Sequence, residues 1–129
     1  MILLREPADW FVEVVNPLTV REATKAYVVG VFVALLRPQQ EVQVNSIVLA
    51  YARACASGRF EQFTELGDWI LWSMVFVPGS HSGHEMVVMD VGRRSYETCW
   101  RLLRGQWDVY AELADKFPII VEGVRNNIG

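Results

Sequence analysis

The sequence contains no long apolar run and no excess of positive charge. Its longest apolar run, Ala26 to Leu36, has 11 residues, whereas a helix that spans a bilayer needs about 20. Lysine and arginine number 12 against 15 aspartate and glutamate, a net charge of −3. Such a charge gives no general attraction to phosphate backbones or anionic lipid. We therefore expect neither a membrane nor nucleic acid as a partner.

Cysteine is also scarce. The two cysteines, Cys55 and Cys99, fall within helical patterns and lack the close spacing of metal-binding or redox pairs. We expect both to be reduced thiols in the core. Residues 1–7 lack an apolar segment that leads to a small-residue cleavage site, so we expect a cytoplasmic location.

The composition and periodicity of the sequence are typical of a helical protein. The chain has 129 residues, of which 52% are apolar and 21% charged, enough to bury one core in a single domain, residues 1–129. Short breaks at proline and glycine separate segments of helical periodicity. We predict an all-α, single-domain bundle of five to seven helices. The expected helices are 8–15, 19–36, 44–57, 60–76, 82–104, 107–116 and 118–126.

Capping signals set several of these boundaries. Thr19 with Glu22, and Ser82 with Glu85, have the spacing of capping boxes, which satisfy unpaired amides at the start of a helix. A glycine follows the third helix and another follows the fifth, and each predicts a C-terminal end.

The second helix contains a stripe of small residues. Ala26, Gly30 and Ala34 recur every four positions, so their side chains would form a flat surface on which another helix could pack closely. Because the residues beyond Ala26 are apolar all round, we expect this helix to be surrounded by others.

One cluster resembles a metal site. His81 and His84, with Glu85 or Asp90 as a third ligand, could supply the nitrogen and carboxylate donors that zinc requires. The cluster fits neither H-E-x-x-H nor H-x-x-E-H, and the capping box already explains Glu85. A metal-assisted hydrolase that uses His81, His84 and Glu85 is one alternative function. Our main hypothesis includes no cofactor.

Asp68 stands in the middle of the most apolar helix. A carboxylate that is ionised there needs a partner, because burying an unpaired charge is costly. Arg93, Arg94, Tyr96 or a helix N-terminus could provide one, so we expect a structural buried charge that locks the fourth and fifth helices together. A pocket that binds an apolar small ligand near Asp68 is a second alternative function.

The surplus of large aromatic side chains predicts a protein interface, because exposed aromatic patches usually mark such surfaces. The arginines of the fifth helix suit solvent or an acidic protein partner better than nucleic acid, since Glu97 can pair with Arg93 and Arg101 at helical spacing. The candidate interface residues are Trp69, Trp72, Phe76, Trp100, Trp107, Arg93, Arg101 and Arg104.

Four short motifs occur together in the second half of the chain. They are Leu66-Gly67-Asp68, an aromatic run from Trp69 to Pro78, Gly92 with Ser95-Tyr96, and Leu113-Ala114 with Phe117. From the second helix onward, this layout resembles a group of uncharacterised bacterial all-helical proteins. The resemblance implies a helical fold and assigns no activity. It also implies that His81 and His84 are peculiar to this chain.

Catalytic signatures are missing from the sequence, which has no glycine-rich phosphate loop, nucleophile elbow or Cys-His pattern. We therefore expect a non-catalytic helical protein that acts through protein contacts. It would do so by self-association as a homo-oligomer, or with a protein partner as a subunit of a larger bacterial or phage assembly.

Overall fold

The structure, a computed structural model, describes residues 7–36 and 44–129. All regular structure within these ranges is helical, which confirms the all-α prediction, and the seven α-helices match the expected number. They are α1 (Pro7–Val15), α2 (Glu22–Ala34), α3 (Val44–Ser57), α4 (Phe60–Phe76), α5 (Glu85–Leu102), α6 (Asp108–Asp115) and α7 (Phe117–Ile128), with a 3-10 turn, η1, at Pro78–His81. None of these described helices has the length and apolar character that crossing a membrane requires.

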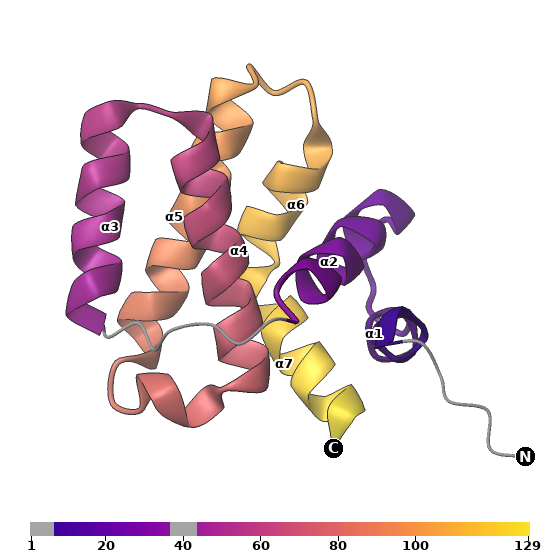
Figure 1. Cartoon of the computed structure of the whole chain (residues 1–129). Helices are drawn as coiled ribbons and strands as arrows, with labels where there is room; N and C mark the ends of the chain where they lie inside the picture. The colour runs from indigo at the N-terminus through magenta and orange to yellow at the C-terminus, as the bar shows by residue number, and fades with distance from the viewer. Residues whose placement is uncertain (1–6, 37–43) are drawn as a thin grey trace, which may run out of the picture.

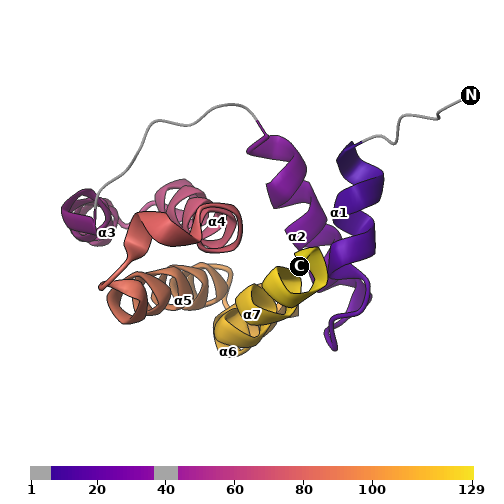
Figure 2. The ribbon, with the colours of Figure 1, turned by 90° about the horizontal axis from the view of Figure 1, so that it is seen from below.

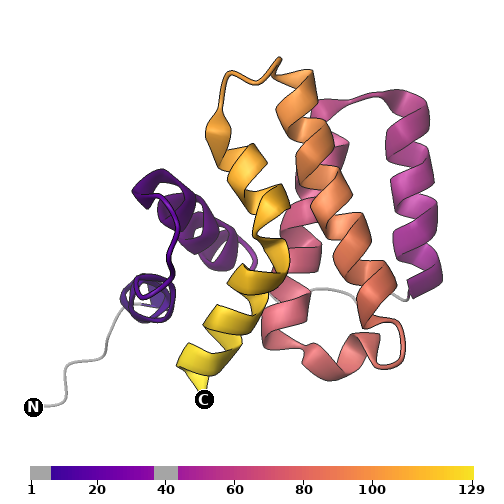
Figure 3. The same cartoon turned by 180° about the vertical axis from the view of Figure 1, so that it is seen from behind.

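The helices form two groups joined by α6 and α7. Helices α3, α4 and α5 lie side by side, and α4 with α5 makes the most extensive contact of the fold (Figure 1). Helices α1 and α2 pack against each other at the other side of the molecule (Figure 2). Helix α6 contacts α2 and α5, while α7 contacts α1 and α4. Seen from behind, α6 and α7 follow α5 back along the molecule (Figure 3).

One cluster of buried apolar side chains includes residues from all seven α-helices. Its largest fully buried members include Tyr96, Phe32 and Phe117. Cys99 belongs to this cluster, whereas Cys55 on α3 is exposed. Both cysteines are free thiols, so the prediction of a core position is wrong for Cys55 alone.

Glycine ends α3 and α5, as the sequence predicts. Gly58 and Gly105 both have left-handed backbone conformations, with φ of 66° and 70°, which residues with a Cβ rarely adopt. Their amides bond back to the preceding turn, Gly58 to the carbonyl of Ala54 at 2.9 Å and Gly105 to that of Trp100 at 3.0 Å. These bonds satisfy carbonyls at the end of each helix.

The predicted capping box at Thr19 and Glu22 does not form. Helix α2 begins at Glu22, and its N-cap, Arg21, makes no side-chain cap hydrogen bond. The Arg21 amide donates instead to Oε1 of Glu112 on α6, at 2.9 Å. The Thr19 carbonyl accepts a bond from Lys116. Contacts with α6 and the segment after it therefore replace the local cap.

The second predicted capping box, Ser82 with Glu85, is also wrong. Helix α5 begins at Glu85, and its N-cap is His84, with no side-chain cap hydrogen bond. Gly83 has a φ of 82°, so the chain turns between Ser82 and the helix. This turn follows η1 and moves the start of the helix beyond the reach of Ser82.

Candidate functional site

Asp68 lies near the middle of α4 and accepts two hydrogen bonds on one oxygen. The hydroxyls of Tyr27 on α2 and Tyr96 on α5 both donate to its Oδ1 atom, at 2.7 Å and 2.8 Å. Gly67 makes this approach possible, because a Cβ at that position would lie 2.8 Å from Cε1 of Tyr96. One carboxylate oxygen therefore connects α2, α4 and α5.

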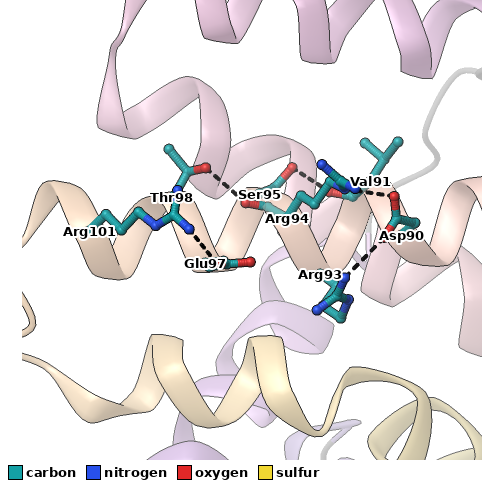
Figure 4. A network of polar contacts seen from close by, with 8 residues as sticks. All are labelled: Asp90, Val91, Arg93, Arg94, Ser95, Glu97, Thr98 and Arg101. Atoms are coloured by element: carbon teal, nitrogen blue, oxygen red, sulfur yellow. Dashed lines mark hydrogen bonds and ion pairs between the residues drawn. The ribbon is translucent and has the colours of Figure 1, made fainter.

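Tyr96 was among the partners expected for Asp68, but the two arginines are not partners. Arg93 and Arg94 bond to Asp90 on their own helix, at 3.2 Å and 2.7 Å (Figure 4). They lie at the outer side of α5, whereas Tyr96 is fully buried.

Tyr27 is a partner of Asp68 that the sequence did not predict. This residue is 41 positions from Asp68, so no local spacing rule links the two. One signal was present: Tyr27 carries the only hydroxyl within the apolar run 26–36. A buried hydroxyl in such a run needs a polar partner from another helix.

A third tyrosine extends the network into α6. The Tyr110 hydroxyl donates to the Tyr27 hydroxyl at 3.2 Å. The Tyr27 ring meets Tyr110, Tyr96 and Trp107 in edge-to-face contacts, with ring centroids 5.3 Å, 6.1 Å and 5.8 Å apart. Edge-to-face packing is a favourable geometry for aromatic rings. The carboxyl of Asp68 is therefore held at the end of a tyrosine chain that reaches from α6 through α2.

The electrostatics of the cluster make Asp68 its titrating group. Burial raises the pKa of the Asp68 carboxyl to about 6, although the bonds from Tyr27 and Tyr96 act in the opposite direction. Burial, followed by the nearby Asp68 charge, raises the pKa of both Tyr27 and Tyr96 well above the ordinary value. The tyrosines therefore stay protonated and donate, while Asp68 changes its charge between weakly acidic and neutral pH.

Asp68 also lines a surface groove between α2 and α4, with a volume of about 350 Å³. The groove is otherwise lined by Val31, Ala34, Leu35, Glu65 and Trp69. Both tyrosine hydrogen bonds end on Oδ1 of Asp68. Its Oδ2 atom accepts no hydrogen bond from residues in the described ranges. The site therefore combines apolar walls with a carboxylate that has bonding capacity left.

The predicted metal ligands are not brought together. His81 is completely buried, and its Nε2 atom lies 2.8 Å from Oγ of Ser73 on α4. Burial lowers the pKa of His81, which keeps the ring neutral at pH 7. His84 is exposed, and Glu85 lies 3.8 Å from Arg125. Throughout the described part of the chain, no three His, Cys, Asp or Glu side chains are placed to hold a metal ion.

Most aromatic residues proposed for an interface contribute to the packing of the molecule. Phe76 contacts the rings of Phe11 on α1 and Phe32 on α2, with centroids 5.7 Å and 4.9 Å apart. Trp107 is the exception, with 43% of its surface exposed. The half-buried members of the predicted set are Trp69, Trp72, Phe76 and Trp100.

Two arginines of the predicted interface, Arg93 and Arg101, form ion pairs along the outer side of α5. Arg101 bonds to Glu97 at 2.6 Å, as the spacing predicts (Figure 4), whereas Arg93 bonds to Asp90. Arg104 follows the end of the helix and has a φ of 56°. The paired side chains are exposed, and exposed ion pairs of this kind contribute little to stability.

An apolar face of α2 points outward. The small residues Ala26, Gly30 and Ala34 are all exposed, and a Cβ on Gly30 would meet no atom within 4 Å. Ala23 and Val33 continue the face, and 40% of the Val33 surface is exposed. The prediction that α2 is surrounded by other helices is therefore wrong. The buried residues of α2 are Thr24, Val28, Val31 and Phe32.

Comparisons of the chain with protein-family models, with curated proteins and with solved structures find no match.

Proposed function

We propose that this protein is a non-catalytic helical protein that works by self-association, with the exposed face of α2 packed against the same face of a second copy. The single observation that carries the proposal is the outward position of Ala26, Gly30 and Ala34. Small residues at this spacing allow two helix backbones to approach closely. Within the described residues, a Cβ on Gly30 at the centre of the stripe would meet no atom of another helix within 4 Å.

The pattern of the face suits a partner helix. Ala23, Ala26, Gly30 and Val33 are exposed at alternating intervals of three and four residues, the spacing of a coiled-coil seam. An ordinary isolated apolar residue on a surface requires no explanation, whereas a contiguous apolar stripe marks an interaction site.

The charge of the face favours a second copy as the partner. No charged residue occurs from Ala26 to Leu36, so two copies can bring these segments together without burying charge or opposing like charges. A two-fold contact uses the same patch on both subunits. A glycine at the centre of such a patch is suited to the point where two identical helices cross.

Sedimentation velocity over a series of concentrations tests the proposal. The wild-type chain should show a reversible monomer–dimer equilibrium, and Gly30→Glu should remain monomeric. Because the space beside Gly30 is open, this variant keeps its fold, which circular dichroism can verify. Ala56→Glu is the matched control, since Ala56 is exposed on α3 and its substitution should leave dimerisation unchanged.

Two results would refute this proposal. One is a wild-type chain that stays monomeric at the highest concentration, and the other is a Gly30→Glu variant that dimerises as the wild type does. Loss of the dimer in Ala56→Glu alone would assign the contact to α3 and overturn the role of α2.

A further inference from the structure

We propose that the groove between α2 and α4 binds a small organic cation, a protonated amine on an apolar body, whose ammonium group bonds to Asp68. This inference goes beyond self-association, because it concerns a small molecule in a groove that shares only Ala34 with the stripe on α2. It would survive a demonstration that the protein is a monomer. The volume of about 350 Å³ lies within the range of small-molecule sites.

The arrangement of the Asp68 carboxylate provides the polar end of the site. Its Oδ1 atom already accepts bonds from Tyr27 and Tyr96, which fix the orientation of the group. Its Oδ2 atom takes no bond from the residues that the structure describes. The Asp68 carboxylate is therefore already ordered and has one oxygen free to accept a hydrogen bond from a ligand. Binding would cost little further side-chain entropy, because the orientation of the carboxylate is fixed beforehand.

The charges around the groove select a cation. Glu65 lies one turn before Asp68 on α4 and lines the same groove, and neither acid forms an ion pair with a lysine or arginine of residues 7–36 and 44–129. A ligand ammonium group would neutralise the charge of the Asp68 carboxylate, which is only partly exposed to solvent. Hydrogen bonds between charged groups are stronger than those between neutral groups.

The walls of the groove require the rest of the ligand to be apolar. Val31 and Ala34 of α2 and Leu35, which follows the end of that helix, form one side, and Trp69 of α4 contributes an indole ring to the other. An alkyl or cycloalkyl body would remove apolar surface from water on both sides. The indole of Trp69 also offers a fluorescence signal that responds to occupancy.

Binding of hexylammonium, compared with hexan-1-ol of nearly the same shape, tests the proposal. Both ligands are titrated by NMR into the full chain, and shifts of the backbone amides around Asp68 report the site. Hexylammonium should bind roughly tenfold or more tightly than hexan-1-ol, because only it makes a charge-assisted bond. Asp68→Asn should abolish the preference, while the control Glu122→Gln, at an exposed carboxylate of α7, should keep it.

A second measurement avoids the risk that the Asp68 variant fails to fold. In the wild type, hexylammonium should bind several-fold more weakly at a pH of about 5 than at about 7.5, because Asp68 becomes protonated while the amine stays charged. The titratable groups around Asp68 are Tyr27, Tyr96, Tyr110, Glu65 and Cys99, and burial raises the pKa of the Cys99 thiol to about 11. The tyrosines do not titrate in this range, and Glu65→Gln should retain the pH dependence. Equal affinity for amine and alcohol, no saturable amine binding, or a pH effect that disappears in Glu65→Gln would overturn the proposal.

Discussion

The ring of Tyr96 lies against the backbone of α4 at Gly67, where a Cβ would be 2.8 Å from the ring atom Cε1. This contact is what allows the Tyr96 hydroxyl to reach Asp68, the next residue along α4. Gly92 on α5 plays a similar part, because a Cβ there would lie 2.6 Å from Cζ of Phe117. Both glycines, each from one of the motifs found in the sequence, are therefore positions of close helix packing, Gly67 beside Tyr96 and Gly92 beside Phe117 and Ile70.

Replacing Gly92 by alanine should destabilise the protein. The added Cβ would also lie 2.9 Å from Cγ2 of Ile70, so neighbours on two sides must move. Overpacking of this kind costs about 1–3 kcal/mol, partly offset by the better helix propensity of alanine. Gly30→Ala is the matched control at concentrations where the chain is monomeric, because its Cβ then enters open space and should stabilise the fold by up to about 1 kcal/mol. Urea denaturation measures both, and equal effects of the two variants would contradict the packing argument.

Asp68→Asn should remove a pH dependence from the stability of the protein. The folded state raises the pKa of Asp68 from 3.8 to about 6, so it holds this proton more tightly than the unfolded chain does. The contribution of Asp68 to stability should therefore be greatest below a pH of about 4 and be lost as the pH rises through about 6. The full change for this group is at most about 3 kcal/mol.

Chemical denaturation of the wild type and Asp68→Asn at several pH values measures this effect. Asparagine still offers Oδ1 to the two tyrosines, so its stability should lack the loss between about pH 4 and 6. Parallel pH curves for the two proteins would show that Asp68 titrates normally and that the argument fails.

Tyr96→Phe should change the titration of Asp68. The substitution keeps the buried ring but removes one of the two donors that favour the ionised carboxylate. The pKa of Asp68 should rise further, and stability at neutral pH should fall by about 1.5–3 kcal/mol, as for hydrogen bonds to charged groups. Carbon-13 NMR of the carboxyl groups follows the pKa directly. An unchanged Asp68 titration would mean that this bond does not stabilise the charge.

The two cysteines should differ strongly in reactivity. Cys55 is exposed, whereas Cys99 is buried and its pKa is raised to about 11 by that burial. Alkylation requires the thiolate, so iodoacetamide should modify one thiol in the folded protein and the second only in urea. Intact-mass spectrometry counts the added groups, and Cys55→Ser should abolish the fast modification. Rapid labelling of Cys99 in that variant would contradict its burial.

The positions of most helices could be predicted because local signals set them. Helices α3 and α4 have the predicted bounds, since glycine ends the first and Pro78 follows the second. The start of α2 could not be predicted, because Glu112 on α6 replaces the local cap at Arg21. A bond between residues far apart in sequence leaves no trace in local spacing.

The candidate site could be predicted only in part. Because burying an unpaired charge is costly, the sequence predicted that Asp68 needs a partner. Tyr96, on the next helix, was one of the candidates. Tyr27 and the groove arise only when α2 is laid across α4. The same placement leaves Ala26 and Gly30 exposed. Their spacing in the sequence is compatible with a buried face as well as with an exposed one.

The sequence by itself determined the helical character of the chain, most helix ends and the need for Asp68 to find a partner, because these follow from periodicity, glycine conformations and the cost of a buried charge. Only the tertiary structure decided which tyrosines meet that carboxylate, which apolar face stays exposed, and that His81 turns toward Ser73 and away from His84. These outcomes depend on how whole helices pack against one another, and packing is the sum of many weak contacts between residues far apart in the chain.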